Sequence, residues 1–169
     1  GTFFDENKNM INKIKVVAKR DSEPVFEGYI YIIEDSWAIY AVDLDIKGYR
    51  MKQEFVDVMK LRQNFSYNST NKIWSKNTQS LDISAGAFGI EFTGKFNYVY
   101  SNYEFIKTFL PKTFTNEITR IEIESNKKDS LFWSNRRPIP LTIEENTDYY
   151  RKDSIYKVRN SEKYLDSTD

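Results

Sequence analysis

The chain has 169 residues, which is the size of one domain. Its 25 basic and 25 acidic residues give a formal net charge of zero, so nothing attracts the whole chain to nucleic acid or anionic lipid. The absence of cysteine and histidine excludes disulfides, thiol nucleophiles, thiolate or imidazole metal sites and histidine-based catalysis in this chain. Aromatic residues make up 16% of it, which is too many for a disordered protein.

The ends of the chain indicate an excised piece of a longer protein. It opens at Gly1 without an initiator methionine, and it closes on a polar segment, residues 161–169. We expect one domain over residues 10–160, with residues 1–9 and 161–169 as flexible ends. No stretch approaches the ~18 consecutive apolar residues of a transmembrane helix.

The first elements in chain order are predicted strands. Apolar residues alternate with lysines from Ile11 to Ala18. Residues 25–34 are β-branched and aromatic on both faces, which is typical of a central strand. Residues 37–47 are apolar at every even position from Ala38 on. Since only a short polar turn separates the last two runs, they predict a β-hairpin.

The middle of the chain has an apolar pattern that fits two kinds of element. Residues 52–67 alternate as a strand does, but the apolar spacing also fits a short helix. We predict a strand from about Val58 to Tyr67 and leave residues 52–58 open between strand and helix. Another strand is predicted over residues 72–84, followed by a turn around Gly86.

The clearest alternation spans residues 88–100 and predicts a strand with one apolar face. A one-residue slip would invert that face, so the register is well specified. A change of parity after Asn102 predicts a bulge or bend. The aromatic side chains of this face are Phe88, Phe92, Phe96, Tyr98 and Tyr100. They form the packed core of the sheet, which we favour, or they line an apolar groove that a curved sheet leaves uncovered.

Helical signals come late in the chain. Thr142 and Glu145 fit a capping box, which predicts a helix over about residues 143–158. A shorter helix is expected around residues 125–135. Long antiparallel strands followed by one or two helices indicate an α+β fold that is mainly antiparallel β.

Three motifs carry a resemblance to known proteins. They are the hairpin of residues 26–39, the Gly86–Gly89 turn leading into Phe96 and Ser101-Asn102-Tyr103, and the string from Phe132-Trp133 through Arg136-Arg137-Pro138-Ile139-Pro140-Leu141-Thr142 to Ser154. Together they resemble an uncharacterised family of Gram-negative outer-membrane proteins over about residues 10–169. The hairpin alone also resembles a strand pair of bacterial envelope half-barrels similar to the periplasmic lipoprotein carriers.

The resemblance implies a setting for the chain. In that family a full-length protein has a signal peptide, a carboxypeptidase-regulatory-like β-domain, a middle region like this chain and a C-terminal outer-membrane β-barrel. The implied location is the periplasmic face of the outer membrane, and the implied fold is a curved sheet or half-barrel. No catalytic or binding residue is established for the family, so none is carried over.

Carboxylate pairs are the first candidates for chemistry. They are Asp43 with Asp45, Glu122 with Glu124, and Glu144 with Glu145. The first pair could bind Ca²⁺, but no glycine-turned loop supplies the other ligands. The other two could serve glycoside hydrolysis, but strand surface and a helix N-terminus explain them more simply. We therefore predict no enzyme, no metal and no cofactor.

Trp133, Arg136 and Arg137 are the second candidates. The arginines could bind an anionic group or stack on the indole ring. The alternative, which we favour, is a structural latch in which Trp133 packs and the following prolines position the last helix. Nucleic acid is not an expected partner, because the charge is neutral and no ribonucleoprotein motif is present.

The leading functional hypothesis is a non-enzymatic periplasmic domain that binds a lipid acyl chain or another envelope protein. Its candidate ligand-binding residues are Phe88, Phe92, Phe96, Tyr98, Tyr100, Trp133, Arg136 and Arg137. One alternative is a carboxylate-dependent enzyme acting on envelope glycans. The other is a structural spacer between the regulatory-like domain and the barrel.

Overall fold

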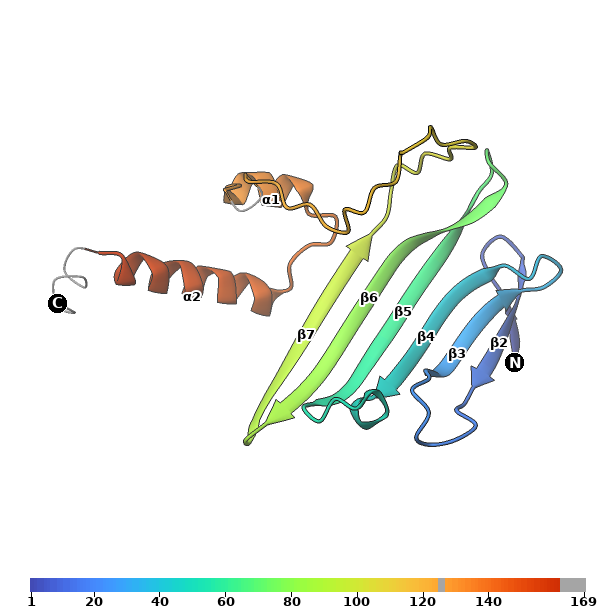
Figure 1. Cartoon of the computed structure of the whole chain (residues 1–169), viewed down its shortest axis with the longest axis horizontal. Helices are drawn as coiled ribbons and strands as arrows, with labels where there is room; N and C mark the ends of the chain where they lie inside the picture. The colour runs from blue at the N-terminus through green and yellow to red at the C-terminus, as the bar shows by residue number, and fades with distance from the viewer. Residues whose placement is uncertain (125–126, 162–169) are drawn as a thin grey trace. The chain divides into compact units, whose positions relative to one another are not determined.

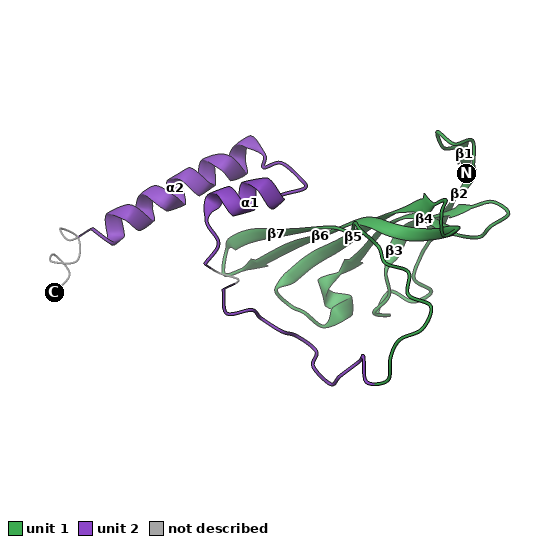
Figure 2. Cartoon of the chain, turned by 90° about the horizontal axis from the view of Figure 1, so that it is seen from above, with its two compact units in different colours: residues 1–111 green, residues 112–169 purple. Residues whose placement is uncertain are grey.

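The computed structural model describes residues 1–124 and 127–161. It consists of two compact units, residues 1–111 and residues 112–169 (Figure 2). Among the described residues, the first unit holds the strands and a short 3₁₀ helix, and the second holds two α-helices. The division falls inside the range 10–160, for which the sequence predicts a single domain.

The first unit is one seven-stranded sheet in which the spatial order of the strands follows the sequence. The strands are β1 (Thr2–Phe4), β2 (Met10–Val16), β3 (Glu27–Ile33), β4 (Ile39–Lys47), β5 (Val56–Asn68), β6 (Ile73–Ala87) and β7 (Ile90–Val99). Every neighbouring pair is antiparallel, and Figure 1 shows β2 to β7 side by side. The sheet is open, because β1 and β7 are its two edge strands and do not pair with each other. The prediction of a mainly antiparallel sheet followed by helices is confirmed.

The predicted hairpin is β3 and β4. Gly28 pairs with Leu44 and Ile30 pairs with Val42. Gly28 has a φ of 132°, and a Cβ atom there would lie 2.4 Å from the carbonyl oxygen of Asp43. Glycine is therefore required at this point of the hairpin, because a side chain would collide with the neighbouring backbone.

Several predicted boundaries are wrong. Residues 1–9 were expected to be a flexible end, but they contain β1, which pairs with β2. The turn expected around Gly86 lies at Phe88 and Gly89, whose φ values of 54° and 77° are those of a type I′ hairpin turn. Residues 48–51 form a short 3₁₀ helix, η1 (Gly48–Met51), and β5 begins at Val56. The open segment 52–58 is thus a turn that leads into a strand.

The pairing register places apolar side chains on one face of the sheet. One row across six strands is Val16, Gly28, Leu44, Leu61, Leu81 and Phe96. We call the following set the apolar face: Ile14, Val16, Ile30, Val42, Leu44, Ile46, Met59, Leu61, Leu81, Ile83, Ala85, Phe92, Phe96 and Tyr98. The opposite, polar face carries rows such as Lys15, Tyr29, Asp43, Arg62, Ser80 and Asn97. The two faces differ because apolar and polar residues alternate along each strand, and the pairing register aligns the apolar residues of neighbouring strands.

Buried apolar side chains lie at two places in the sheet. Val42, Ile46 and Ala85 are buried on the apolar face of β4 and β6. Ile11 and Ile33 are buried opposite each other on the paired strands β2 and β3. Interior strands bury more than edge strands because they have a neighbour on each side.

The second unit contains α1 (Ser130–Arg136) and α2 (Ile143–Arg159). The Asp129 carboxylate caps α1 by accepting a hydrogen bond from the backbone N–H of Phe132. The capping box of Thr142 and Glu145 is present at the start of α2, as predicted. Of the predicted flexible end 161–169, residues 162–169 lie outside the described part of the chain. None of the described helices has the length and apolar character needed to cross a membrane.

Candidate functional site

The apolar face changes from buried to exposed between the middle of the sheet and β7. Ile46 on β4 is 3% exposed, whereas Phe92, Phe96 and Tyr98 on β7 are 53%, 48% and 44% exposed. The favoured interpretation of these rings as a packed core is therefore wrong. β7 is the last strand of an open sheet, so its side chains have strand neighbours on one side only.

The structure brings some of the predicted ligand residues together and separates others. Phe92, Phe96 and Tyr98 line one face of β7, as the alternation predicts. Phe88 lies in the hairpin turn and is 98% exposed. Tyr100 lies just beyond β7, with the Lys76 ammonium 4.7 Å from its ring centroid. Three of the five predicted aromatic residues thus lie on one face of β7.

Trp133, Arg136 and Arg137 lie in the second unit. The Arg136 guanidinium lies 5.4 Å from the ring centroid of Phe132, and the Arg137 guanidinium lies 5.5 Å from that of Tyr149. The two guanidinium groups thus lie over the rings of Phe132 and Tyr149. Because Arg137 follows α1 and Tyr149 belongs to α2, the second contact links the two helices. Trp133, which the favoured latch expects to be packed, is 50% exposed and contacts Phe132 edge to face, with ring centroids 5.3 Å apart.

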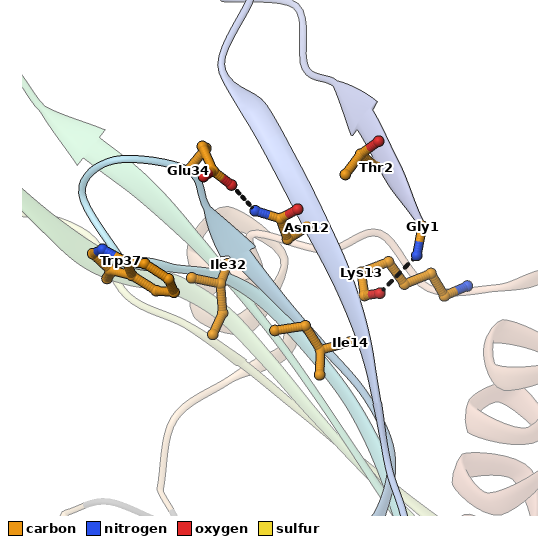
Figure 3. A pocket seen from close by; sticks show the side chains of 8 residues that line it. All are labelled: Gly1, Thr2, Asn12, Lys13, Ile14, Ile32, Glu34 and Trp37. Carbon is orange, nitrogen blue, oxygen red and sulfur yellow. Dashed lines mark hydrogen bonds between the residues drawn. The ribbon is translucent and has the colours of Figure 1, made fainter.

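A recess of about 410 Å³ lies at the β2–β3 side of the sheet. Figure 3 shows Ile14, Ile32 and Trp37 on the same side of the sheet, where they form its apolar wall. Asn12 and Glu34 form a polar end, and the Asn12 amide donates a hydrogen bond to the Glu34 carboxylate. The recess therefore offers an apolar wall next to hydrogen-bonding groups.

A second, larger recess of about 1020 Å³ lies where the β1–β2 and β3–β4 turns meet the ends of β5 and β6. Its rings pack edge to face or tilted, with centroids 6.3 Å apart for Tyr40 and Trp74 and 5.5 Å apart for Tyr67 and Trp74. Its acidic lining residues are Asp5, Glu6, Glu34 and Asp35. Neither recess follows from the sequence, because both depend on which turns come together at one end of the sheet.

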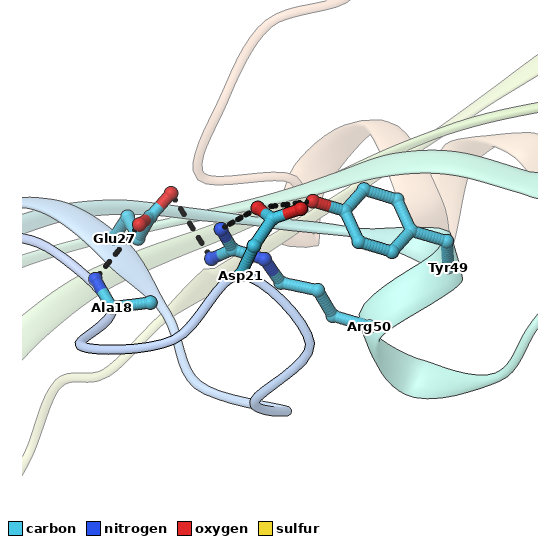
Figure 4. A network of polar contacts seen from close by, with 5 residues as sticks. All are labelled: Ala18, Asp21, Glu27, Tyr49 and Arg50. Carbon is cyan, nitrogen blue, oxygen red and sulfur yellow. Dashed lines mark hydrogen bonds and ion pairs between the residues drawn. The ribbon is translucent and has the colours of Figure 1, made fainter.

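A buried arginine holds the β2–β3 connection against η1. Arg50 is 6% exposed, and its guanidinium lies 2.9 Å from an Asp21 oxygen and 3.0 Å from a Glu27 oxygen. The Tyr49 hydroxyl donates to Asp21 at 2.7 Å, and the Ala18 N–H donates to Glu27 at 2.7 Å (Figure 4). We call these five residues the Arg50 cluster. No local sequence motif predicts the Arg50 cluster, because Asp21 and Glu27 lie more than twenty positions from Arg50 in the sequence.

The Arg50 cluster stabilises charged forms. Hydrogen bonds from the Ala18 N–H and from Arg50 lower the pKa of Glu27 below its ordinary value of 4.5. Hydrogen bonds from Tyr49 and Arg50 lower the pKa of Asp21 below 3.8. The carboxylate of Asp21, followed by Tyr49 and Glu27, raises the pKa of Arg50. All three groups therefore stay ionised at neutral pH, as their hydrogen bonds require.

Residues 1–103 match the model of a family of unknown function, DUF5686. The chain belongs to this family. The DUF5686 match covers all seven strands and ends at Tyr103, whose hydroxyl donates a hydrogen bond to the Lys76 carbonyl. No curated protein and no solved structure matches the chain.

In each of the three carboxylate pairs that the sequence suggests as candidates, at least one carboxylate forms an ion pair or caps a helix. In the DUF5686 sheet, Asp43 lies 3.3 Å from the Arg62 guanidinium. In the second unit, Glu124 pairs with Lys127 at 2.9 Å, and Glu145 belongs to the capping box of α2. Among the described residues, no group of three or more histidine, cysteine or carboxylate side chains is placed to hold a metal ion.

Proposed function

We propose that this DUF5686 sheet is a non-enzymatic binding module that holds an apolar chain, the acyl part of a lipid, against its apolar face. The observation that carries the proposal is the half-exposed set of Phe92, Phe96 and Tyr98, of which Phe96 continues the apolar row of Leu44, Leu61 and Leu81 outward to β7. Large contiguous apolar patches on folded proteins usually mark binding surfaces.

The dimensions of the apolar face suit an acyl chain. A row across the six strands β2 to β7 covers five gaps of about 4.8 Å, or roughly 24 Å. One leaflet of a bilayer's hydrocarbon core is about 15 Å thick, so an extended acyl chain fits along such a row. The recess in Figure 3 adds a polar end at Asn12 and Glu34, which suits the junction between an acyl chain and its headgroup.

Sequence motifs support an envelope setting for this binding module. The hairpin of residues 26–39 and the string from Phe132 to Ser154 resemble outer-membrane proteins with a regulatory-like domain and a barrel. In that setting the module faces the periplasm, and the barrel is covalently linked to it. Another envelope protein is the competing occupant of the apolar face. The structural partners of Asp43, Glu124 and Glu145 favour a binding role over a carboxylate enzyme.

Fluorescence titration with cis-parinaric acid tests the proposal. We expect saturable binding that weakens roughly tenfold in Phe96→Ser, because the lost ring removes about 50 Å² or more of apolar contact. Val99→Ser is the matched control, since Val99 is similarly exposed but lies on the polar face. Absence of saturable binding by the unaltered chain, or an equal loss in Val99→Ser, would contradict the proposal.

A further inference from the structure

The free edge of β7 has a defined set of backbone groups. The Tyr100 N–H donates to the Asn77 carbonyl at 2.9 Å, and the pairing of β7 with β6 runs without a shift from Val99 to Ile90. In an antiparallel ladder, successive residues point their backbone groups alternately to the two sides of the strand. The even-numbered residues of β7 therefore face β6, and the odd-numbered residues present their N–H and carbonyl groups at the free edge.

This edge is suited to strand addition. It is ten residues long, and no other strand of the described residues pairs with it. Long unprotected edges are templates for another strand, and proteins usually block them with proline, a bulge or an inward-pointing charge. β7 has no proline and no bulge, and its charged residues Glu91 and Lys95 point to the polar face.

Charge complementarity identifies the added strand. In an antiparallel pair of two β7 strands with Thr93 opposite its own copy, Glu91 of each copy lies opposite Lys95 of the other. All three residues are odd-numbered, so their edge N–H and carbonyl groups also meet in this register. We propose that β7 pairs with β7 of a second copy in this register, joining the sheets of the two copies about a twofold axis.

The apolar face agrees with the same register. Phe92 lies opposite Gly94 of the other copy, where no side chain competes for space, and Ile90 lies opposite Phe96. Apolar residues thus meet apolar residues or glycine on one side, while the ion pairs form on the other. The apolar faces of the two copies become continuous across the joint.

The neighbouring registers lose these contacts. A pair centred on Lys95 or on Glu91 places like charges directly opposite each other, which is destabilising. A pair centred on Gly94 puts Glu91 opposite Asn97, and one centred on Phe92 puts it opposite Thr93. Only the register centred on Thr93 forms both Glu91–Lys95 pairs.

Single cysteines test the register, because the chain has no cysteine of its own. In Thr93→Cys the two sulfur-bearing residues face each other at a Cα separation of about 5.5 Å, which a disulfide can bridge. In the control Asn97→Cys, the two cysteines lie eight residues apart along the pair, at roughly 26 Å. We expect mild oxidation to link Thr93→Cys into dimers and to leave Asn97→Cys monomeric.

Charge reversal tests the ion pairs in solution by sedimentation equilibrium. We expect Glu91→Lys to weaken dimerisation about tenfold, and the double change Glu91→Lys with Lys95→Glu to restore it. Equal cross-linking of the two cysteine variants would overturn the register. A monomeric chain with no cross-link at Thr93→Cys would overturn the dimer itself and leave the edge to another strand. Neither result bears on acyl binding, which is measured separately.

Discussion

The β4–η1 region and the β6–β7 hairpin belong to the same sheet but are stabilised in different ways. Ile46 and Arg50 are 3% and 6% exposed, and the arginine is held by the carboxylates of Asp21, in the β2–β3 connection, and Glu27, at the start of β3. At the hairpin, Phe88 is 98% exposed and Phe96 is 48% exposed. The first region therefore contributes buried contacts to the fold, and the second leaves apolar surface exposed.

Truncation of one apolar side chain in each region gives the largest expected contrast. Ile46→Ala removes a buried side chain from an interior strand, so we expect it to lower the free energy of unfolding by about 2–5 kcal/mol. Phe96→Ala removes a half-exposed ring, and we expect a loss of about 1 kcal/mol or less. Urea denaturation measures both, and equal losses would show that β7 belongs to the core after all.

Two glycines with positive φ extend the comparison to the backbone. In Gly28→Ala, the new Cβ would lie 2.4 Å from the Asp43 carbonyl oxygen, so the hairpin must shift and we expect a loss of more than about 2 kcal/mol. In Gly89→Ala, nothing lies within 4 Å, so only the left-handed φ of 77° is penalised, by about 1 kcal/mol. A Gly89→Ala variant as unstable as Gly28→Ala would mean that the hairpin turn is as constrained as the centre of the sheet.

The Arg50 cluster predicts acid sensitivity of the first region. The folded-state pKa values of Glu27 and Asp21 lie below their ordinary values of 4.5 and 3.8. Each carboxylate thus adds stability that is complete above its ordinary pKa and is lost as the pH falls through its lowered folded-state pKa. We expect the free energy of unfolding to decline on acidification below about pH 4.5.

Arg50→Met separates this effect from general acid denaturation. It removes the shared partner of both carboxylates while keeping most of the side-chain volume, so we expect a lower Tm at pH 7 and a shallower decline in acid. Lys60→Met, on the exposed polar face, is the control and should retain the full pH dependence. An unchanged pH profile in Arg50→Met would show that the decline arises elsewhere in the chain.

Local patterns predicted the parts of the fold that depend on local chemistry. The β3–β4 hairpin follows from two apolar runs around a polar turn, and the start of α2 follows from the spacing of Thr142 and Glu145. The face shared by Phe92 and Phe96 follows from their even spacing. These elements need no information from distant residues.

The candidate site was less predictable, because alternation does not show whether a face is covered. An apolar strand face gives the same pattern in a packed core and on an open edge, so the exposure of Phe96 required the strand order. Phe88 continued the alternation, although it belongs to a turn that usually takes asparagine or glycine. Arg50 joins residues 29 and 23 positions away, Asp21 and Glu27, which no local motif records.

The smallest expected effect is a stabilisation at the hairpin turn. Phe88→Asn creates an Asn-Gly pair with Gly89, the preferred sequence for a type I′ turn, and it gives up almost no buried surface. We expect a gain of about 0.5–1 kcal/mol in urea denaturation with unchanged acyl binding. A loss of acyl binding in this variant would show that Phe88 contacts the ligand.

Methyl NMR with a doxyl-labelled stearic acid tests the central claim, that an apolar chain lies on one face of the sheet. The spin label should broaden the methyl signals of Ile30 and Ile83, which belong to the apolar face, and leave those of Ile11 and Ile33 sharp. Equal broadening of all four signals, or broadening of Ile11 and Ile33 alone, would contradict it.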